Sequence, residues 1–282
     1  MSNEPKRQHS IPEMLQRRFA NAHGKLWFFD KQRASLGVQA TSPDNLFVRK
    51  RQYTLSHNDG TRDWSLETRY SKIEGYMNLL IEKIVQSVLG GEYPSLTRNE
   101  RGLIDLYVYE QWRRVPELYD SLISDSDFVA LVEESVAEYE QKYRALTPEE
   151  RARFSSKAYL KDERHRARVI SLSHTTGNAQ AALSKKGLFF ARTARNRSFL
   201  LGSSPVLKLT PIGQNDLNHP QVEVWLAIHP NVAIILAADE SLNRNIMLPA
   251  EGVRQINRII AKQSGTFAAR DKALVESLAR YF

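Results

Sequence analysis

The sequence contains no cysteine among its 282 residues. This absence excludes disulfide bonds, thiolate zinc sites and cysteine nucleophiles, and it favours a reducing compartment. The opening residues, MSNEPKRQHS, have no apolar stretch of the kind that a secretory signal requires. The longest aliphatic run, residues 232–238, is too short to cross a bilayer. We therefore expect a cytoplasmic protein without a membrane partner.

The linear signatures of common enzymes are also absent. The sequence has no Gly-rich phosphate loop ending in Gly-Lys-Ser/Thr, no Gly-x-Gly-x-x-Gly, no His-Glu-x-x-His and no Gly-x-Ser-x-Gly. Nucleases that use scattered carboxylates leave no linear pattern, so this class stays open. Nothing in the sequence indicates an organic cofactor.

Positive charge is in excess. The chain has 40 Lys and Arg against 32 Asp and Glu, a formal net charge of +8. Such a balance attracts polyanions over a Debye length of about 10 Å, which makes nucleic acid a candidate partner. Basic globular proteins without that role are common, so the charge alone does not decide.

The chain changes character near residue 185. Before this point, apolar residues recur with helical spacing and predict helices at 64–89 and 97–115. Thr97 and Glu100 have the spacing of a capping box at the start of the second helix. Two more helices are expected, one after Ser-Asp-Ser-Asp and one that begins at Pro148.

After this point, short β-branched and aromatic runs dominate. The predicted strands are 188–191, 199–201, 206–209, 222–228 and 232–237. Alternation in VEVWLAI predicts a sheet with one buried face. The N-terminal KLWFFDK is also strand-like, and we expect it to join the late strands in one sheet. Helices are expected at 250–263 and from about residue 271.

Together these patterns predict one α+β domain, residues 1–282. A helical lobe at about residues 60–183 would pack on a mostly antiparallel sheet formed largely by the C-terminal third. The sheet lobe would comprise about residues 6–55 and 185–282.

Four polar residues of the helical region are candidates for chemistry. Glu67 and Glu74 lie two turns apart on one helix, where paired carboxylates can share a proton or hold a divalent metal. A solvated helix flank is the simpler alternative. Gln111 shares a stripe with apolar residues, and Arg114 follows one turn later. A buried amide and guanidinium require partners, which the two carboxylates can supply.

His9 completes the candidate site. Pro12 favours an extended backbone at Ile11, so the imidazole can be held at a sheet edge. A lone histidine is commonly structural, whereas a neighbouring carboxylate would raise its pKa and make it a usable acid or base. We expect His9, Glu67, Glu74, Gln111 and Arg114 to converge between the helices and the sheet, as a catalytic centre or as a structural cluster.

The run KDERHRAR is the candidate contact for a phosphate backbone. Its cationic residues are Lys161, Arg164, Arg166 and Arg168, and the alternative is a solvated helix face. Arg168 and His174 also have a spacing found in the Arg-His catalytic motif of helical RNases.

The order of several motifs resembles the bacterial domain-of-unknown-function family 4238, nearly end to end. The opening His-x-x-Pro is His9 and Pro12, followed by Phe19 and Ala20. The segments LETRYSKIEG and LTRNERGLIDLYVYEQWRRVPE are similar to its first two helices, and the second ends in the family's Gln-x-x-Arg-x-Pro. Asn257 stands in the place of a recurrent asparagine, whereas Ser203 replaces an aspartate of the family's strand turn.

The resemblance implies no reaction. Family members resemble accessory or effector proteins of bacteria and their mobile elements, which implies a role in phage defence or a toxin-like role. The leading hypothesis is a cytoplasmic bacterial defence or conflict protein that acts on or binds nucleic acid, alone or with another defence-system protein. If it is an enzyme, we expect a nuclease that is metal-dependent or uses a His–Arg pair. The alternative is a non-enzymatic protein-binding or scaffold component. The sequence does not predict the oligomeric state.

Overall fold

The computed structural model describes residues 5–57, 59–174, 177–194, 196–214, 216–238 and 242–282. The N-terminal segment forms short elements: β1 (Arg7–His9), α1 (Glu13–Arg18), β2 (Leu26–Asp30), η1 (Lys31–Leu36), β3 (Gln39–Thr41), η2 (Pro43–Asn45), β4 (Val48–Lys50), β5 (Leu55–Ser56) and β6 (Arg62–Asp63). The helical middle comprises α2 (Ser65–Gly90), α3 (Arg98–Arg113), α4 (Pro116–Leu122), α5 (Asp125–Lys142), α6 (Pro148–Phe154), α7 (Lys157–Ser173) and α8 (Gly177–Ser184).

The last third contains most of the sheet. Its elements are β7 (Gly187–Arg192), β8 (Leu201–Gly202), β9 (Val206–Leu209), β10 (Glu223–His229), β11 (Val232–Ala237), β12 (Arg244–Met247), α9 (Ala250–Gln263), β13 (Thr266–Ala269) and α10 (Lys272–Ala279). The predicted α+β class is confirmed, with mostly antiparallel pairing and several strands in the C-terminal third.

Local sequence signals explain where the helices begin and end. The Thr97 hydroxyl accepts a hydrogen bond from the Glu100 amide, and the Glu100 carboxylate accepts one from the Thr97 amide, so α3 has the predicted capping box. Thr147 and Glu150 form the same arrangement at α6. Helix α2 ends at Gly91, whose φ of +93° suits a glycine.

The strands form two main sheets, so the prediction of a single sheet was wrong. One sheet has the order β12-β7-β11-β10-β9, and the other has the order β3-β2-β13-β8. The N-terminal strand β2 does pair with a late strand, with Phe29 opposite Phe267. Strand β10 also differs from its predicted one-sided pattern, because Val224, Trp225 and Leu226 are all buried. Strand β10 lies between β11 and β9, and helix α1 contacts it.

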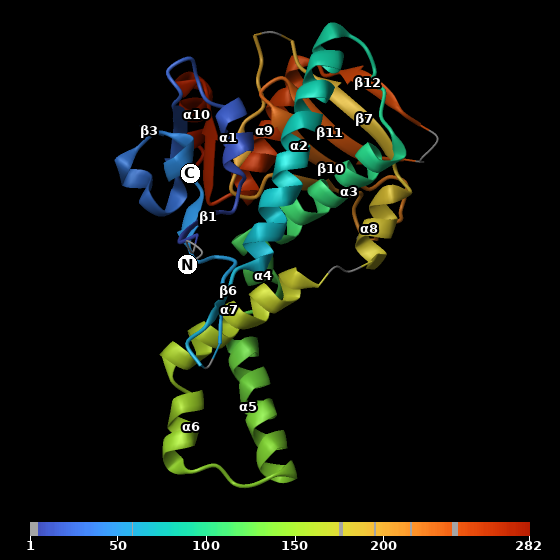
Figure 1. Ribbon diagram of the computed structural model, residues 1–282. Coiled ribbons are helices and arrows are strands. Elements are labelled where there is room, and N and C mark those ends of the chain that lie inside the picture. The colour runs from blue at the N-terminus through green and yellow to red at the C-terminus, as the bar shows by residue number, and fades with distance from the viewer. Residues whose placement is uncertain (1–4, 58, 175–176, 195, 215, 239–241) are drawn as a thin grey trace.

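The two sheets share one hydrophobic core that runs from Ile11 to Leu278. Helices α2 and α3 lie across the five-stranded sheet, while α9 contacts strands of both sheets (Figure 1). A smaller cluster, Tyr53, Leu66, Tyr70, Val169 and Leu172, joins the N-terminal segment to α2 and α7. The polar candidates lie beside this smaller cluster.

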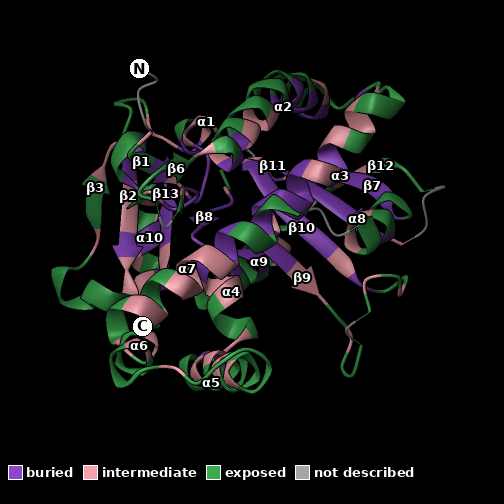
Figure 2. Ribbon diagram, turned by 60° about the horizontal axis from the view of Figure 1, so that its bottom comes forward, coloured by how far each residue is buried: buried purple, intermediate pink, exposed green. Residues whose placement is uncertain are grey.

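Helices α5 and α6 project from the body of the molecule (Figure 1). We call α5, α6 and α7 the helical arm. Figure 2 shows the contrast between the exposed arm and the buried strands β7, β10 and β11. Among the described residues, no helix has the length and apolar character to cross a membrane.

Candidate functional site

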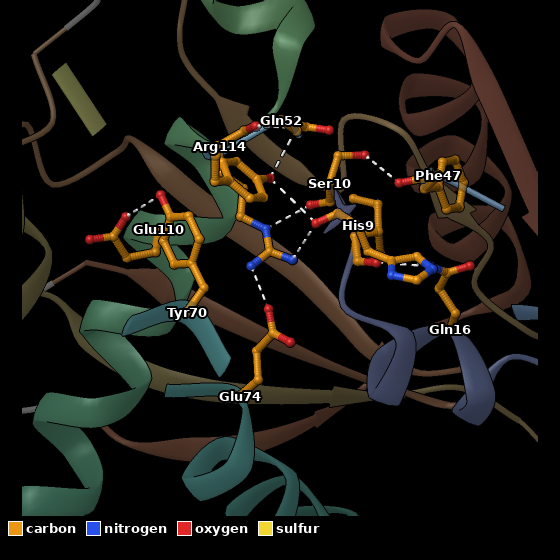
Figure 3. A network of polar contacts seen from close by, with 11 residues as sticks. His9, Ser10, Gln16, Phe47, Gln52, Tyr70, Glu74, Glu110 and Arg114 are labelled. Atoms are coloured by element: carbon orange, nitrogen blue, oxygen red, sulfur yellow. Dashed lines mark hydrogen bonds and ion pairs between the residues drawn. The ribbon is translucent and has the colours of Figure 1, made fainter. Parts of the chain in front are cut away.

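Arg114 occupies the centre of the polar contacts (Figure 3). It caps the C-terminal end of α3, because Pro116 starts a new helix two residues later. Its Nε donates to the Ser10 carbonyl oxygen at 2.6 Å, its Nη1 donates to Glu74 Oε1 at 2.6 Å, and its Nη2 donates to the His9 carbonyl oxygen at 3.3 Å. The side chain is 1% exposed. The predicted convergence of the N-terminal segment, α2 and α3 is therefore present in the structure.

The aromatic rings around Arg114 complete its enclosure. Its guanidinium carbon lies 5.2 Å from the centre of the Tyr70 ring and 6.0 Å from that of Tyr53. Burial alone would lower the pKa of Arg114, but the Glu74 carboxylate raises it above its ordinary value. Arg114 is a permanent buried cation with a bound counter-ion.

A second arginine reaches the same point from α7. Arg168 is 8% exposed, and its Nη2 donates to the Arg114 carbonyl oxygen at 2.7 Å. Burial lowers the pKa of this guanidinium. Gln52 donates to the same carbonyl at 3.4 Å. We call His9, Gln52, Glu67, Glu74, Arg114 and Arg168 the buried polar cluster.

The two predicted carboxylates have different environments. Glu74 is the ion-pair partner of Arg114, and its side chain is 24% exposed. Glu67, two turns earlier on α2, accepts no hydrogen bond from the described residues. Burial and the nearby charge of Glu74 raise the pKa of Glu67 to about 7, against the opposing effect of Arg114. At neutral pH the Glu67 carboxyl is therefore close to its pKa and can take up or release a proton.

His9 contributes its backbone more than its ring. Its carbonyl oxygen accepts hydrogen bonds from Arg114 and from the Tyr53 hydroxyl, while β1 pairs with β4 so that His9 lies opposite Val48. Burial lowers the pKa of the imidazole. This direction is opposite to the one that a dominant carboxylate neighbour would produce, so at neutral pH the ring is mostly uncharged.

Gln111 is buried, as its place on the α3 stripe predicts. Its amide oxygen accepts no hydrogen bond within the described part of the chain. No three His, Asp or Glu side chains among the described residues form a group that could hold a metal ion.

The four cationic candidates of α7 do not lie together on one exposed surface. Lys161 is exposed and Arg166 is half-buried, but Arg164 donates to the Ile123 and Ser124 carbonyl oxygens and Arg168 belongs to the buried polar cluster. His174 is exposed, whereas Arg168 is buried. Sequence reasoning missed the inward position of Arg168, although its spacing of four from the buried Leu172 is a signal for it.

A different surface gathers cationic side chains that are exposed or half-buried. A pocket of about 910 Å³ lies where the end of β7, the loop after it and the start of α10 meet, and its cationic side chains are Arg192, Arg197, Arg270 and Lys272. Among the described residues that line it, Asp271 is the one carboxylate. An adjoining pocket of about 450 Å³ shares Arg197 and adds Arg254 and Arg258 from α9. We call the two pockets together the cationic groove.

Hydrogen bonds hold the wall of this groove in place. Asn231 donates to Thr193 Oγ1 at 2.8 Å and to the Arg197 carbonyl oxygen at 2.6 Å, and its own side-chain oxygen accepts from Arg270 at 2.7 Å. Asn257 donates to the Ser198 carbonyl oxygen at 2.9 Å and accepts from the Leu200 amide at 3.0 Å. The backbone that carries Arg197 is therefore fixed from both sides.

The electrostatics of the groove are positive. Among the described residues, no carboxylate forms an ion pair with Arg192, Arg197 or Arg270, whereas Lys272 pairs with Glu276 at 3.1 Å. His229, two residues before Asn231, responds to this field. Burial, together with the positive charges of Arg270 and Arg18, lowers its pKa to about 4.

The sequence contains a signal for the groove in ARTARNRS, residues 191–198, where arginines recur among small polar residues. This stretch was assigned to a strand region, and its charge was not used. Residue 195 lies outside the described residues. The asparagine that resembles a recurrent family residue, Asn257, lies directly beneath this segment.

Comparison with known proteins agrees with the resemblance seen in the motifs. A family model described as "Protein of unknown function (DUF4238)" matches residues 7–273, and the chain belongs to this family. Neither the curated proteins nor the solved structures gave a match to this chain. The family description carries no activity, so function has to be argued from the geometry.

Proposed function

We propose that this protein binds nucleic acid, with the phosphate backbone in the cationic groove, in the cytoplasm of bacteria. The observation that carries the proposal is the set of arginines without carboxylate partners among the described residues, Arg192, Arg197 and Arg270, on a hydrogen-bonded wall. Guanidinium groups donate two parallel hydrogen bonds to a phosphate, and a fixed backbone reduces the entropy lost on binding.

The buried polar cluster has a structural role in this proposal. Arg114 uses three of its nitrogens on acceptors of the protein and is 1% exposed, so it does not meet a phosphate. It joins the N-terminal segment to α2 and α3. The catalytic roles first considered for His9, Glu67, Glu74, Gln111 and Arg114 stay predictions, as do the roles in defence and with a defence-system partner.

A nuclease activity is the second candidate, and Glu67 is the observation that favours it. A carboxyl with a pKa of about 7 can donate or accept a proton at neutral pH. Purified protein incubated with labelled RNA or DNA and Mg²⁺ or Mn²⁺ should cut the strand if this candidate holds, and Glu67→Gln should abolish the cleavage. Uncut strands at several pH values would remove it.

Binding is tested by fluorescence anisotropy with a labelled single strand of about 20 nucleotides. The charge-reversed double variant Arg192→Glu with Arg197→Glu should lose at least about tenfold in affinity, because each cation contributes a phosphate contact. The matched control is Lys157→Glu with Lys161→Glu, which makes the same charge change at two exposed positions of α7.

The control also compares the two basic regions. If binding used the α7 surface first predicted, the Lys157→Glu with Lys161→Glu variant would lose affinity and the groove variant would retain it. Equal losses in both variants would show that only net charge matters, and would contradict a site in the groove.

A further inference from the structure

The smaller pocket of the cationic groove contains an exposed aromatic ring. Tyr281 follows the C-terminal end of α10, lines the pocket of about 450 Å³ and is 64% exposed. Its backbone amide donates a hydrogen bond to the Leu278 carbonyl oxygen at 3.1 Å. Arg258 of α9 donates through Nη2 to the Tyr281 hydroxyl at 3.2 Å, and its guanidinium carbon lies 5.5 Å from the ring centre. The ring is therefore held in position while most of its surface is open to a ligand.

The two pockets of the groove differ in their charge balance. In the larger pocket, Arg192, Arg197 and Arg270 have no carboxylate partner among the described residues. In the smaller pocket, Arg254 forms an ion pair with Glu251 at 2.6 Å, so the charge of this arginine is offset. The smaller pocket also has an apolar lining, formed by Val253, Leu274 and Leu278. The larger pocket therefore suits an anion, and the smaller one suits a flat group with little charge.

The two pockets are continuous with each other. The residues that line both are Asn196, Arg197, Ser198 and Asp271. The carboxylate of Asp271 accepts a hydrogen bond from the Ala273 amide at 2.9 Å and caps α10, so the fold already uses this acceptor. A nucleotide joins an anionic phosphate to a flat aromatic base, which are the two kinds of group that adjoining pockets of this chemistry can bind.

We propose that the groove selects single-stranded nucleic acid, with one base stacked on the ring of Tyr281 and adjacent phosphates bound by Arg192, Arg197 and Arg270. This inference rests on the proposed function, because the same groove holds the backbone. In an unpaired strand the faces of the bases are free to stack on an aromatic side chain, whereas in a duplex neighbouring base pairs cover them. Every base has such a face, so we expect little dependence on sequence.

Fluorescence anisotropy with a labelled single strand tests the role of the ring. Tyr281→Ala should reduce the affinity at least about fivefold, because the stacking contact with a base is lost. Tyr281→Phe keeps the ring and should retain most of the affinity. Tyr143→Ala is the matched control, because Tyr143 is 66% exposed, has Lys142 Nζ 5.4 Å from its ring centre and lies at the end of α5, outside the groove. This control should bind as the wild type does.

An abasic strand of the same length separates stacking from backbone contacts. It keeps the phosphates but has no bases, so Tyr281→Ala should bind it with the affinity of the wild type, and the same should hold for a duplex. Equal losses of affinity for the abasic and the ordinary strand would overturn the inference.

The groove variant Arg192→Glu with Arg197→Glu distinguishes this inference from the proposed function. If it loses affinity for the ordinary strand while Tyr281→Ala does not, the groove binds the backbone and the stacking inference is wrong. If the groove variant binds the strand as tightly as the wild type, the proposed function itself fails.

Discussion

The buried polar cluster and the cationic groove both concentrate arginine, but they use it in opposite ways. In the cluster, Arg114 donates hydrogen bonds to one carboxylate and two carbonyl oxygens of the protein, so its charge is neutralised within the fold. In the groove, Arg192 and Arg197 find no carboxylate partner among the described residues, while their backbone is held by neighbours. The position of the acceptors, more than the number of arginines, separates a structural cation from a ligand-binding one.

The largest effect should follow from Arg114→Met. This change leaves the partly buried Glu74 carboxylate and the Ser10 and His9 carbonyl oxygens without their donor, and the free energy of unfolding should fall by about 3–5 kcal/mol. Arg197→Met, at an exposed position, should change it by less than about 0.5 kcal/mol. Denaturant unfolding of both variants measures the contrast, and similar losses would contradict it.

Glu67→Gln should alter how stability depends on pH. Below pH 4.5 the carboxyl is protonated in the folded and unfolded chains, so it has no effect there. Between pH 4.5 and about 7 the folded protein keeps a proton that the unfolded chain has released, so wild-type stability falls as pH rises. At pH 8 the variant should be more stable than wild type by about 1–3 kcal/mol, a difference that vanishes near pH 4.

The comparison of Glu67→Gln with wild type uses unfolding curves at pH 4, 6 and 8. Glu74→Gln is a useful contrast, because it removes the counter-ion of Arg114 and should destabilise the protein at neutral pH. A constant difference between Glu67→Gln and wild type across this range would show that the Glu67 carboxyl titrates at its ordinary pKa.

Asn257→Ala should have a smaller effect, on both stability and affinity for a single strand. It removes the partners of the Leu200 amide and the Ser198 carbonyl, with a cost of about 1–3 kcal/mol. Because the Arg197 backbone loses one of its supports, affinity for a single strand should also fall severalfold. Reduced stability with unchanged affinity would show that the groove wall does not need this support.

The elements that local signals encode were predicted well from the sequence. Helix α3 has its predicted capping box, and α9 and β9 have their predicted limits. The pairing of β2 with a late strand was predicted, but the separation of the late strands into two sheets was not, because the apolar pattern of a strand does not specify its neighbours. The alternation of residues in β10 predicted one buried face, but residues on both faces of this strand are buried.

The candidate site was also predicted only in part. The contact of Arg114 with His9 and Glu74 was predicted, because a buried guanidinium needs hydrogen-bond acceptors and the sequence contains few candidates for them. The inward turn of Arg168 was not, since a run of charges conceals the helical spacing that buries one of them. The groove was missed because its residues come from β7, α9 and α10, which meet only in the fold.

The salt dependence of single-strand affinity tests the central contrast most directly. Arg192→Ala with Arg197→Ala should make the slope of log Kd against log salt concentration shallower by about 1.4, because two phosphate contacts with a single strand are lost. A double variant with the wild-type slope would contradict it, because the strand would then bind elsewhere.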